Sequence, residues 1–188
     1  WSSFHPEFAY LPRKFKIAVC GTQTDQAATQ VHDIGIYLKK DSNGNIGFQI
    51  LAGGGLGRTP VIGKEIFEFV EKPHLLTALE AILRVYNRLG RRDNKYKARI
   101  KILVKETGVD EFKNLVMREW MQIKNGPLTI TEQEIRRCKS YFNDPSYEEL
   151  LDPPDNLTAE LHKNILFKSW YDQNVSSHKR PGYSIVTV

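Results

Sequence analysis

The sequence is poor in cysteine: Cys20 and Cys138 are the only two in 188 residues, and they lie far apart. Two thiolates cannot supply the four ligands that an iron–sulfur cluster or a structural zinc site needs. We therefore expect no metal site in this chain. We expect both thiols to be reduced, as in a cytoplasmic protein, rather than joined in a disulfide.

Long apolar runs are also missing. No run approaches the ~18 residues that a membrane span needs, and no signal-peptide pattern opens the chain. These two absences predict a protein without a membrane partner. The chain begins at Trp1 rather than at methionine, which we interpret as the sign of an internal fragment.

Catalytic signatures of common kinds are absent as well. The five histidines show no metal-ligand spacing, and no G-x-S-x-G motif occurs. The pair His32-Asp33 is consistent with an oriented imidazole, although a structural hydrogen bond is the more ordinary explanation. What the sequence has is a modest excess of base, with a net charge of +5. This charge fits an anionic partner, large or small, and is not by itself a nucleic-acid signature.

The local patterns predict an α+β fold with an antiparallel or mixed sheet and helices packed on one face. Strands are expected over 14–20, 31–39 and 46–53, and the Asn-Gly pair between the last two indicates a hairpin. Residues 62–70 fit a strand or a short helix. Helical spacing predicts helices over 75–89, 95–106 and 110–123. Thr131 and Glu134 form a capping-box pattern before a further helix that reaches Phe142.

The same patterns predict three parts of the chain. Residues 1–126 form the α+β domain, and residues 127–182 form a mostly helical extension with a linker and one helix over 159–173. Residues 183–188 are expected to form the first strand of a truncated unit. A strand cannot satisfy its backbone alone, so we expect its partner in a missing part of the chain.

Two lysines stand out in the run LPRKFK. On a strand Lys14 and Lys16 would point to the same face, where their ammonium groups repel each other unless an anion lies nearby. One interpretation is a solvated strand face on which lysines block edge pairing. The other is a small-anion site in which the lysines hold charge and deliver protons.

Two further segments favour anions. The loop GGGLGRTP, 53–60, is neither a P-loop nor a dinucleotide fingerprint. It is either a flexible turn or a place where exposed amides and Arg58 meet an anion. The segment RRDNKYKARIK, 91–101, is the densest basic stretch; it fits a solvated helix face, an anion site or, with Tyr96 as its one aromatic, a nucleic-acid surface.

Taken together and in order, LPRKFKIAV, VHDIGI, GFQILAGGGLGRTP and AILRVYNRLGRRDNKYKARIK resemble the nitrite and sulfite reductase haemoprotein family. The resemblance is close over residues 9–123 and weaker from 124 to 182. It implies a sirohaem bridged to a [4Fe–4S] cluster. It also implies six-electron reduction of sulfite to sulfide, or of nitrite to ammonia as the alternative. The electron donor would be ferredoxin or a flavoprotein subunit, with no nucleic-acid partner.

The resemblance also implies roles for single residues. Lys14 and Lys16 match the lysines on the substrate side, and Arg13 matches an arginine near the macrocycle. The backbone of Gly53, Gly54 and Gly55 would approach the sirohaem, and Arg99 would contact one of its carboxylates. The family's two cysteine pairs do not occur here, so we expect this fragment to hold no cofactor and to be inactive alone.

Overall fold

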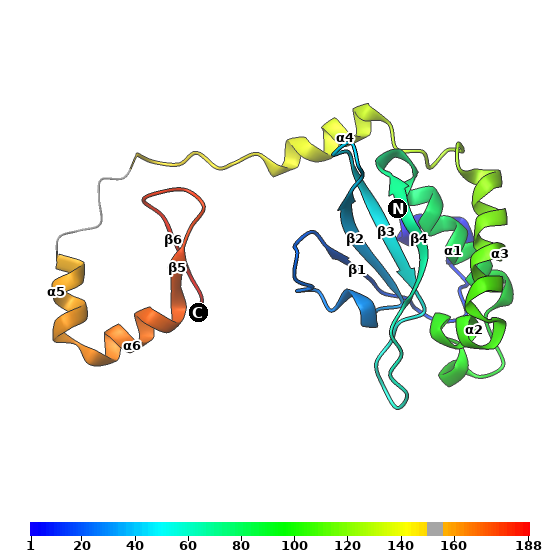
Figure 1. Cartoon of the computed structure of the whole chain (residues 1–188), viewed down its shortest axis with the longest axis horizontal. Helices are drawn as coiled ribbons and strands as arrows, with labels where there is room; N and C mark the ends of the chain where they lie inside the picture. Colours follow the sequence, from blue (N-terminus) through cyan, green and yellow to red (C-terminus); the bar gives the residue numbers. More distant parts are fainter. Residues whose placement is uncertain (150–155) are drawn as a thin grey trace. The chain divides into compact units, whose positions relative to one another are not determined.

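The computed structural model describes residues 1–149 and 156–188. Two compact units make up the chain, Trp1–Ser140 and Tyr141–Val188 (Figure 1). The boundary therefore follows helix α4 (Glu132–Lys139), whereas we predicted it at residue 126. Residues 150–155 of the predicted extension lie outside the described part of the chain.

A four-stranded mixed sheet organises the first unit, and its strands follow the chain order. They are β1 (Ile17–Cys20), β2 (Ile34–Lys40), β3 (Ile46–Ala52) and β4 (Lys64–Glu71). β1 runs parallel to β2, and the other pairs are antiparallel. The predicted β2–β3 hairpin is confirmed, with the Asp41 carboxylate accepting the amides of Asn43 and Asn45, each at 2.8 Å.

The first strand begins later than we predicted, at Ile17 instead of Lys14. The alternation of side chains nevertheless extends back before it. Phe15 and Ile17 pack against the core, whereas Lys14 and Lys16 are exposed. The Lys16 carbonyl accepts the amide of Ile34 at 3.1 Å, so this extended segment is attached to the sheet where β2 begins.

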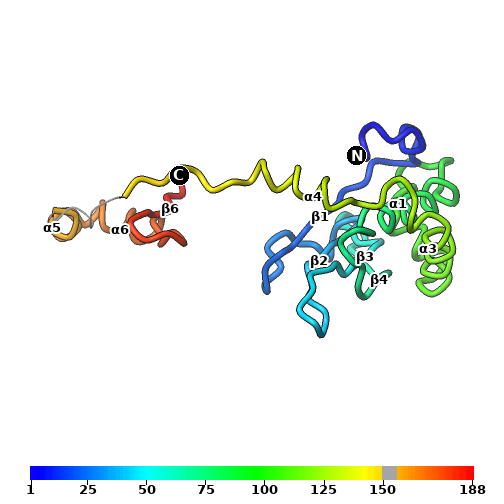
Figure 2. Tube along the Cα trace, turned by 90° about the horizontal axis from the view of Figure 1, so that it is seen from above, coloured from blue at the N-terminus to red at the C-terminus, as the bar shows by residue number. Residues whose placement is uncertain are grey.

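Three helices cover one face of the sheet, as Figures 1 and 2 show: α1 (Leu75–Leu89), α2 (Ile100–Thr107) and α3 (Val109–Ile123). The core between helices and sheet contains fully buried side chains from both layers, among them Ile34, Ile50, Ile66, Ile82, Leu83, Phe112 and Val116. The α+β class with helices on one face is thereby confirmed. α2 starts at Ile100 and not at Lys95, because Lys95–Lys97 form a separate 3-10 turn. Lys95 and Arg99 consequently do not share a helical face.

The remaining elements lie beyond α3. The capping box is confirmed, since the Thr131 hydroxyl accepts the Glu134 amide at 3.2 Å. The second unit holds α5 (Asn156–Lys163), α6 (Ile165–Asn174), β5 (Val175–Ser177) and β6 (Ser184–Val186). Asn164 caps α6 and divides the single helix that we predicted. β6 pairs with β5, so our expectation of a partner outside this chain was wrong.

No helix in the described ranges is long and apolar enough to cross a membrane.

Tyr86 connects the helical layer to two loops. Its side chain is fully buried in α1, and its hydroxyl lies 2.7 Å from the carbonyl oxygen of Ala98 and 3.1 Å from that of Arg13. Burial raises the pKa of Tyr86 to about 12. The hydroxyl therefore stays protonated and remains a donor at any ordinary pH.

We predict that Tyr86→Phe lowers the free energy of unfolding by about 1–2 kcal/mol, because buried carbonyl oxygens lose their donor. Chemical denaturation measures this loss, and Tyr96→Phe is the matched control because Tyr96 is 76% exposed. A free tyrosine ionises near 10, so the wild type should lose stability between pH 10 and 12 through this group. Equal effects of the two substitutions would contradict the role given to Tyr86.

Candidate functional site

A cavity of about 800 Å³ lies where three segments of the first unit meet. Arg13 comes from the segment before β1, Leu56–Thr59 from the loop after β3, and Tyr96–Ile102 from the start of α2. Five of the lining side chains are basic: Arg13, Arg58, Lys97, Arg99 and Lys101. No acidic side chain is among the described residues that line it. The cavity is of ligand size and is suited to an anion.

The loop after β3, which forms one wall of this cavity, is hydrogen-bonded to α2. Gly55 and Val61 exchange two backbone hydrogen bonds of 2.9 Å, which close the loop. The Lys101 ammonium donates to the carbonyl oxygens of Thr59 at 2.7 Å and Leu56 at 3.3 Å. Burial, with a smaller effect of the Arg99 charge, lowers the pKa of Lys101. The loop that carries Arg58 is thus attached to the helix that carries Lys101.

Arg99 lines the cavity, but its charge has a partner within the fold. Its Nε and Nη2 atoms lie 3.0 and 2.8 Å from Oδ1 of Asp33, whose side chain is 4% exposed. Its Nη1 donates to the Leu56 carbonyl at 3.2 Å. The predicted contact of Arg99 with a sirohaem carboxylate stays a prediction, and the structure adds that this guanidinium is already neutralised.

Besides Arg99, Asp33 contacts two other segments of the chain. Its Oδ2 accepts the amide of Lys16 at 3.2 Å, and its carbonyl accepts the amide of Gly53 at 2.9 Å. From the sequence, Asp33 is notable only as a neighbour of His32, and the Nδ1 atom of His32 instead lies 2.9 Å from the Ala28 carbonyl oxygen. A lone acid at the start of a strand gives no sequence signal of a partner in a distant segment.

The three consecutive glycines are buried, and internal packing requires each of them. Gly53 has a φ of +83°, which favours glycine. A Cβ at Gly54 would collide with the carbonyl oxygens of His32 and Gln30. A Cβ at Gly55 would lie 2.6 Å from Nη2 of Arg99. The predicted approach of this backbone to a macrocycle remains untested.

Lys14 and Lys16 do not line the cavity, but they directly follow Arg13, which does. Both side chains are exposed, and within residues 1–149 and 156–188 neither ammonium has a hydrogen-bond or ion-pair partner. Arg13 is fixed by a 2.7 Å hydrogen bond from Nη1 to the Lys95 carbonyl. Lys14 is therefore the neighbour in sequence of a cavity-lining residue, and no described group compensates the charge of Lys14 or Lys16.

Two other basic residues of the segment 91–101 interact with groups that do not line the cavity. Arg91 pairs with Asp93 at 2.6 Å and with Glu106 at 3.5 Å. Arg92 donates to the carbonyls of Tyr10 and Asn87, each at 2.7 Å. The segment 91–101 is consequently not one continuous basic face, which weakens the nucleic-acid interpretation.

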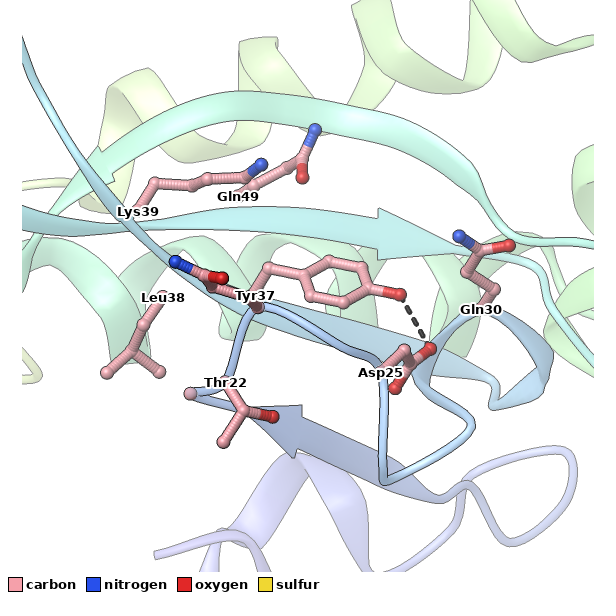
Figure 3. Close-up of a pocket in the computed structure, with 9 residues that line it drawn as sticks. Thr22, Asp25, Gln30, Tyr37, Leu38, Lys39 and Gln49 are labelled. Atoms are coloured by element: carbon pink, nitrogen blue, oxygen red, sulfur yellow. Dashed lines mark hydrogen bonds between the residues drawn. The ribbon is translucent and has the colours of Figure 1, made fainter.

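A second hollow of about 600 Å³ lies between the β1–β2 connection and strands β2 and β3 (Figure 3). None of the predicted site residues lines it. Asp25 accepts the amide of Thr29 at 2.8 Å and the hydroxyl of Tyr37 at 2.7 Å. The Thr29 amide is the main reason that the pKa of Asp25 falls to about 2. Asp25 therefore organises the connection from within.

Comparison with known proteins decides the family. Residues 1–124, more than half of the chain, match the model of the nitrite and sulphite reductase 4Fe-4S domain. The chain belongs to the nitrite and sulfite reductase family. Over 147 residues it is 30% identical to "Sulfite reductase [ferredoxin] 1" of Mycolicibacterium paratuberculosis, which covers 74% of this chain and 26% of that protein. Over 111 residues it is 33% identical to "Sulfite reductase [NADPH] hemoprotein beta-component" of Shewanella sediminis, covering 55% of this chain and 19% of that protein.

A solved structure supports the same family fold. The Mycobacterium tuberculosis NirA protein aligns with a TM-score of 0.57 and 26% identity, over 80% of this chain and 24% of that one. The chain thus spans about a quarter of the length of the Mycolicibacterium paratuberculosis and Mycobacterium tuberculosis proteins. The α+β arrangement predicted from the local sequence patterns agrees with this match.

The iron–sulfur cluster named in the family's description does not fit the residues present. Cys20 is buried, Cys138 is exposed, and both are free. In the described part of the chain no group of three or more His, Cys, Asp and Glu side chains could hold a metal ion. An octacarboxylate such as sirohaem does fit the cationic cavity, where Arg13, Arg58, Lys97 and Lys101 would hold it.

We predict that Asp25→Asn destabilises the first unit without affecting the cavity. Because its folded pKa is depressed from 3.8 to about 2, Asp25 stabilises the fold above pH 4 and loses this effect as the pH falls to 2. Denaturation at several pH values should show a difference from wild type at pH 7 that disappears near pH 2. Glu68→Gln, an exposed position on β4, is the control and should show no such difference.

Proposed function

We propose that this chain is part of an assimilatory sulfite reductase that reduces sulfite to sulfide with six electrons. The observation that carries the proposal is the cavity, whose described lining has five basic side chains and no acidic one. One of these, Arg13, is followed in the sequence by Lys14 and Lys16. The names of the sulfite reductase relatives support sulfite as the substrate. Nitrite, reduced to ammonia, is the alternative, because the same lysines would hold either anion.

The cavity would hold the carboxylates of a sirohaem. Arg13 and Arg58 offer planar forks that match a carboxylate with two hydrogen bonds, and Lys97 and Lys101 add point charges. When bound, the sirohaem supplies the iron at which the substrate accepts electrons. Several cations side by side repel one another, and a polyanion would relieve this repulsion.

The exposed lysines would act on the substrate. Lys14 and Lys16 lie on the same side of an extended segment and have free ammonium groups. They would bind the oxygens of sulfite and donate protons as those oxygens leave as water. Electrons would come from ferredoxin or from a flavoprotein subunit, and we infer a cytoplasmic setting for this exchange. Because the cluster ligands are missing, we expect the chain alone to be inactive.

The cofactor part of the proposal is tested by the colour of the longer polypeptide that contains this chain. Purified from cells, it should be red-brown, with a Soret band and bound iron. Colourless, iron-free protein would contradict the proposal. Strong salt-dependent binding of DNA by this chain would instead favour the nucleic-acid interpretation.

We predict that Lys14→Met and Lys16→Met, each made in that longer polypeptide, leave the Soret band nearly unchanged. Sulfite turnover should fall by roughly two orders of magnitude or more, because general acid catalysis contributes about that much. Steady-state kinetics with a chemical reductant measure the loss. Lys64→Met, an exposed position on β4, is the control and should keep wild-type turnover. Near-normal turnover in both lysine variants would refute their role.

A further inference from the structure

The Asp33 carboxylate contacts the cavity-lining residue Arg99 without lining the cavity itself. It accepts two hydrogen bonds from Arg99 at 2.8 and 3.0 Å, and a third from the Lys16 amide at 3.2 Å. With its side chain 4% exposed, Asp33 lies out of reach of solvent and does not line the cavity. A ligand in the cavity would meet Arg99 but not Asp33.

This arrangement divides the basic side chains of the cavity into two kinds. The Arg99 charge is compensated at contact distance by Asp33, whereas Lys97 and Arg58 have no hydrogen-bond or ion-pair partner in the described ranges. Arg13 and Lys101 donate only to backbone carbonyls, which leave their formal charge in place. An entering anion would therefore experience four net cations, although five basic side chains line the cavity.

We propose that Asp33 is a positioning residue that sets the affinity of this cavity for anions. By neutralising Arg99 it limits the effective positive charge to that of Arg13, Arg58, Lys97 and Lys101. It also keeps the guanidinium against Gly55, where a side chain would leave no room for it. This inference rests on the proposed function for the identity of the natural ligand, an octacarboxylate.

Removing either charge of the Asp33–Arg99 pair is expected to change the affinity for anions, in opposite directions. Asp33→Asn would release the charge of Arg99 and tighten anion binding by roughly two- to tenfold, the effect of one added charge at a partly hydrated site. Arg99→Gln would leave Asp33 unpaired and weaken binding by a similar factor. The double variant has neither charge and should bind within about twofold of wild type.

The experiment titrates the longer polypeptide that contains this chain, freed of its cofactor, with two probes, uroporphyrin and inorganic pyrophosphate. Uroporphyrin carries eight carboxylates, as sirohaem does, and its fluorescence reports binding. Calorimetry follows pyrophosphate. Asp25→Asn is the matched control, since it also removes a carboxylate that accepts backbone amides but lies outside the cavity. It should lower the melting temperature and leave both affinities unchanged.

Each outcome has a distinct meaning. Weaker binding of both probes by Asp33→Asn and by the double variant would overturn the proposal and leave Asp33 a purely structural group. A double variant as weak as Arg99→Gln would also overturn it, because Arg99 would then bind the anion directly. If the predicted pattern appears with pyrophosphate while uroporphyrin does not bind, the role of Asp33 holds and the proposed cofactor site fails.

Discussion

The contact between Asp33 and Arg99 is the constraint on which the geometry of the site depends. Through one buried carboxylate and one carbonyl, Asp33 joins the lysine segment at Lys16, the glycine turn at Gly53 and the start of α2 at Arg99. These segments are far apart in the sequence. A hydrogen-bonded charge pair in a buried position tolerates little displacement, because separating it leaves an uncompensated charge. The relative positions of the three segments are therefore fixed.

The basic character of the cavity is a local property and not a general feature of the fold. On α1, Arg84 lies within 3.2 Å of Glu7, Glu80 and Glu119, so its charge is fully compensated. Among the described interactions of the cavity wall, Arg99 is the one basic side chain with such a partner. Part of the surplus of base in the sequence thus lies around this cavity, and a field of one sign in a concave surface attracts and retains anions.

The sequence predicted well what local chemistry determines. The Asn-Gly turn, the helical spacing from Leu75 and the Thr131 cap depend on residues a few positions apart, and all three formed as expected. Contacts without a local sequence signal were missed. The pairing of β6 with β5, the parallel contact of β1 with β2 and the reach of Asp33 to Arg99 leave no periodic pattern in the chain.

The site residues show the same division. Arg13, Arg58 and Arg99 were identified from separate motifs, and the fold does bring them to one cavity. Lys97 and Lys101 belonged to a basic stretch that looked like one helical face. Their placement became clear only because α2 starts at Ile100 and the 3-10 turn before it redirects the chain. The difference of five residues between the predicted and the observed start of α2 changes which cations face the cavity.

Because this chain lacks the cluster cysteines, the steps of the proposed reduction would be divided between this chain and residues outside it. In the proposed reductase, charge compensation and proton delivery would use side chains of this chain, at Arg13, Arg58, Lys14 and Lys16. Electron delivery requires a cluster with thiolate ligands, and two separated free cysteines cannot provide them. In the proposed reductase the electrons would therefore reach the substrate from residues outside this chain, while the protons would come from the lysines within it. Substitutions in this chain should then change binding and proton transfer more than the reduction potential of the metal centre.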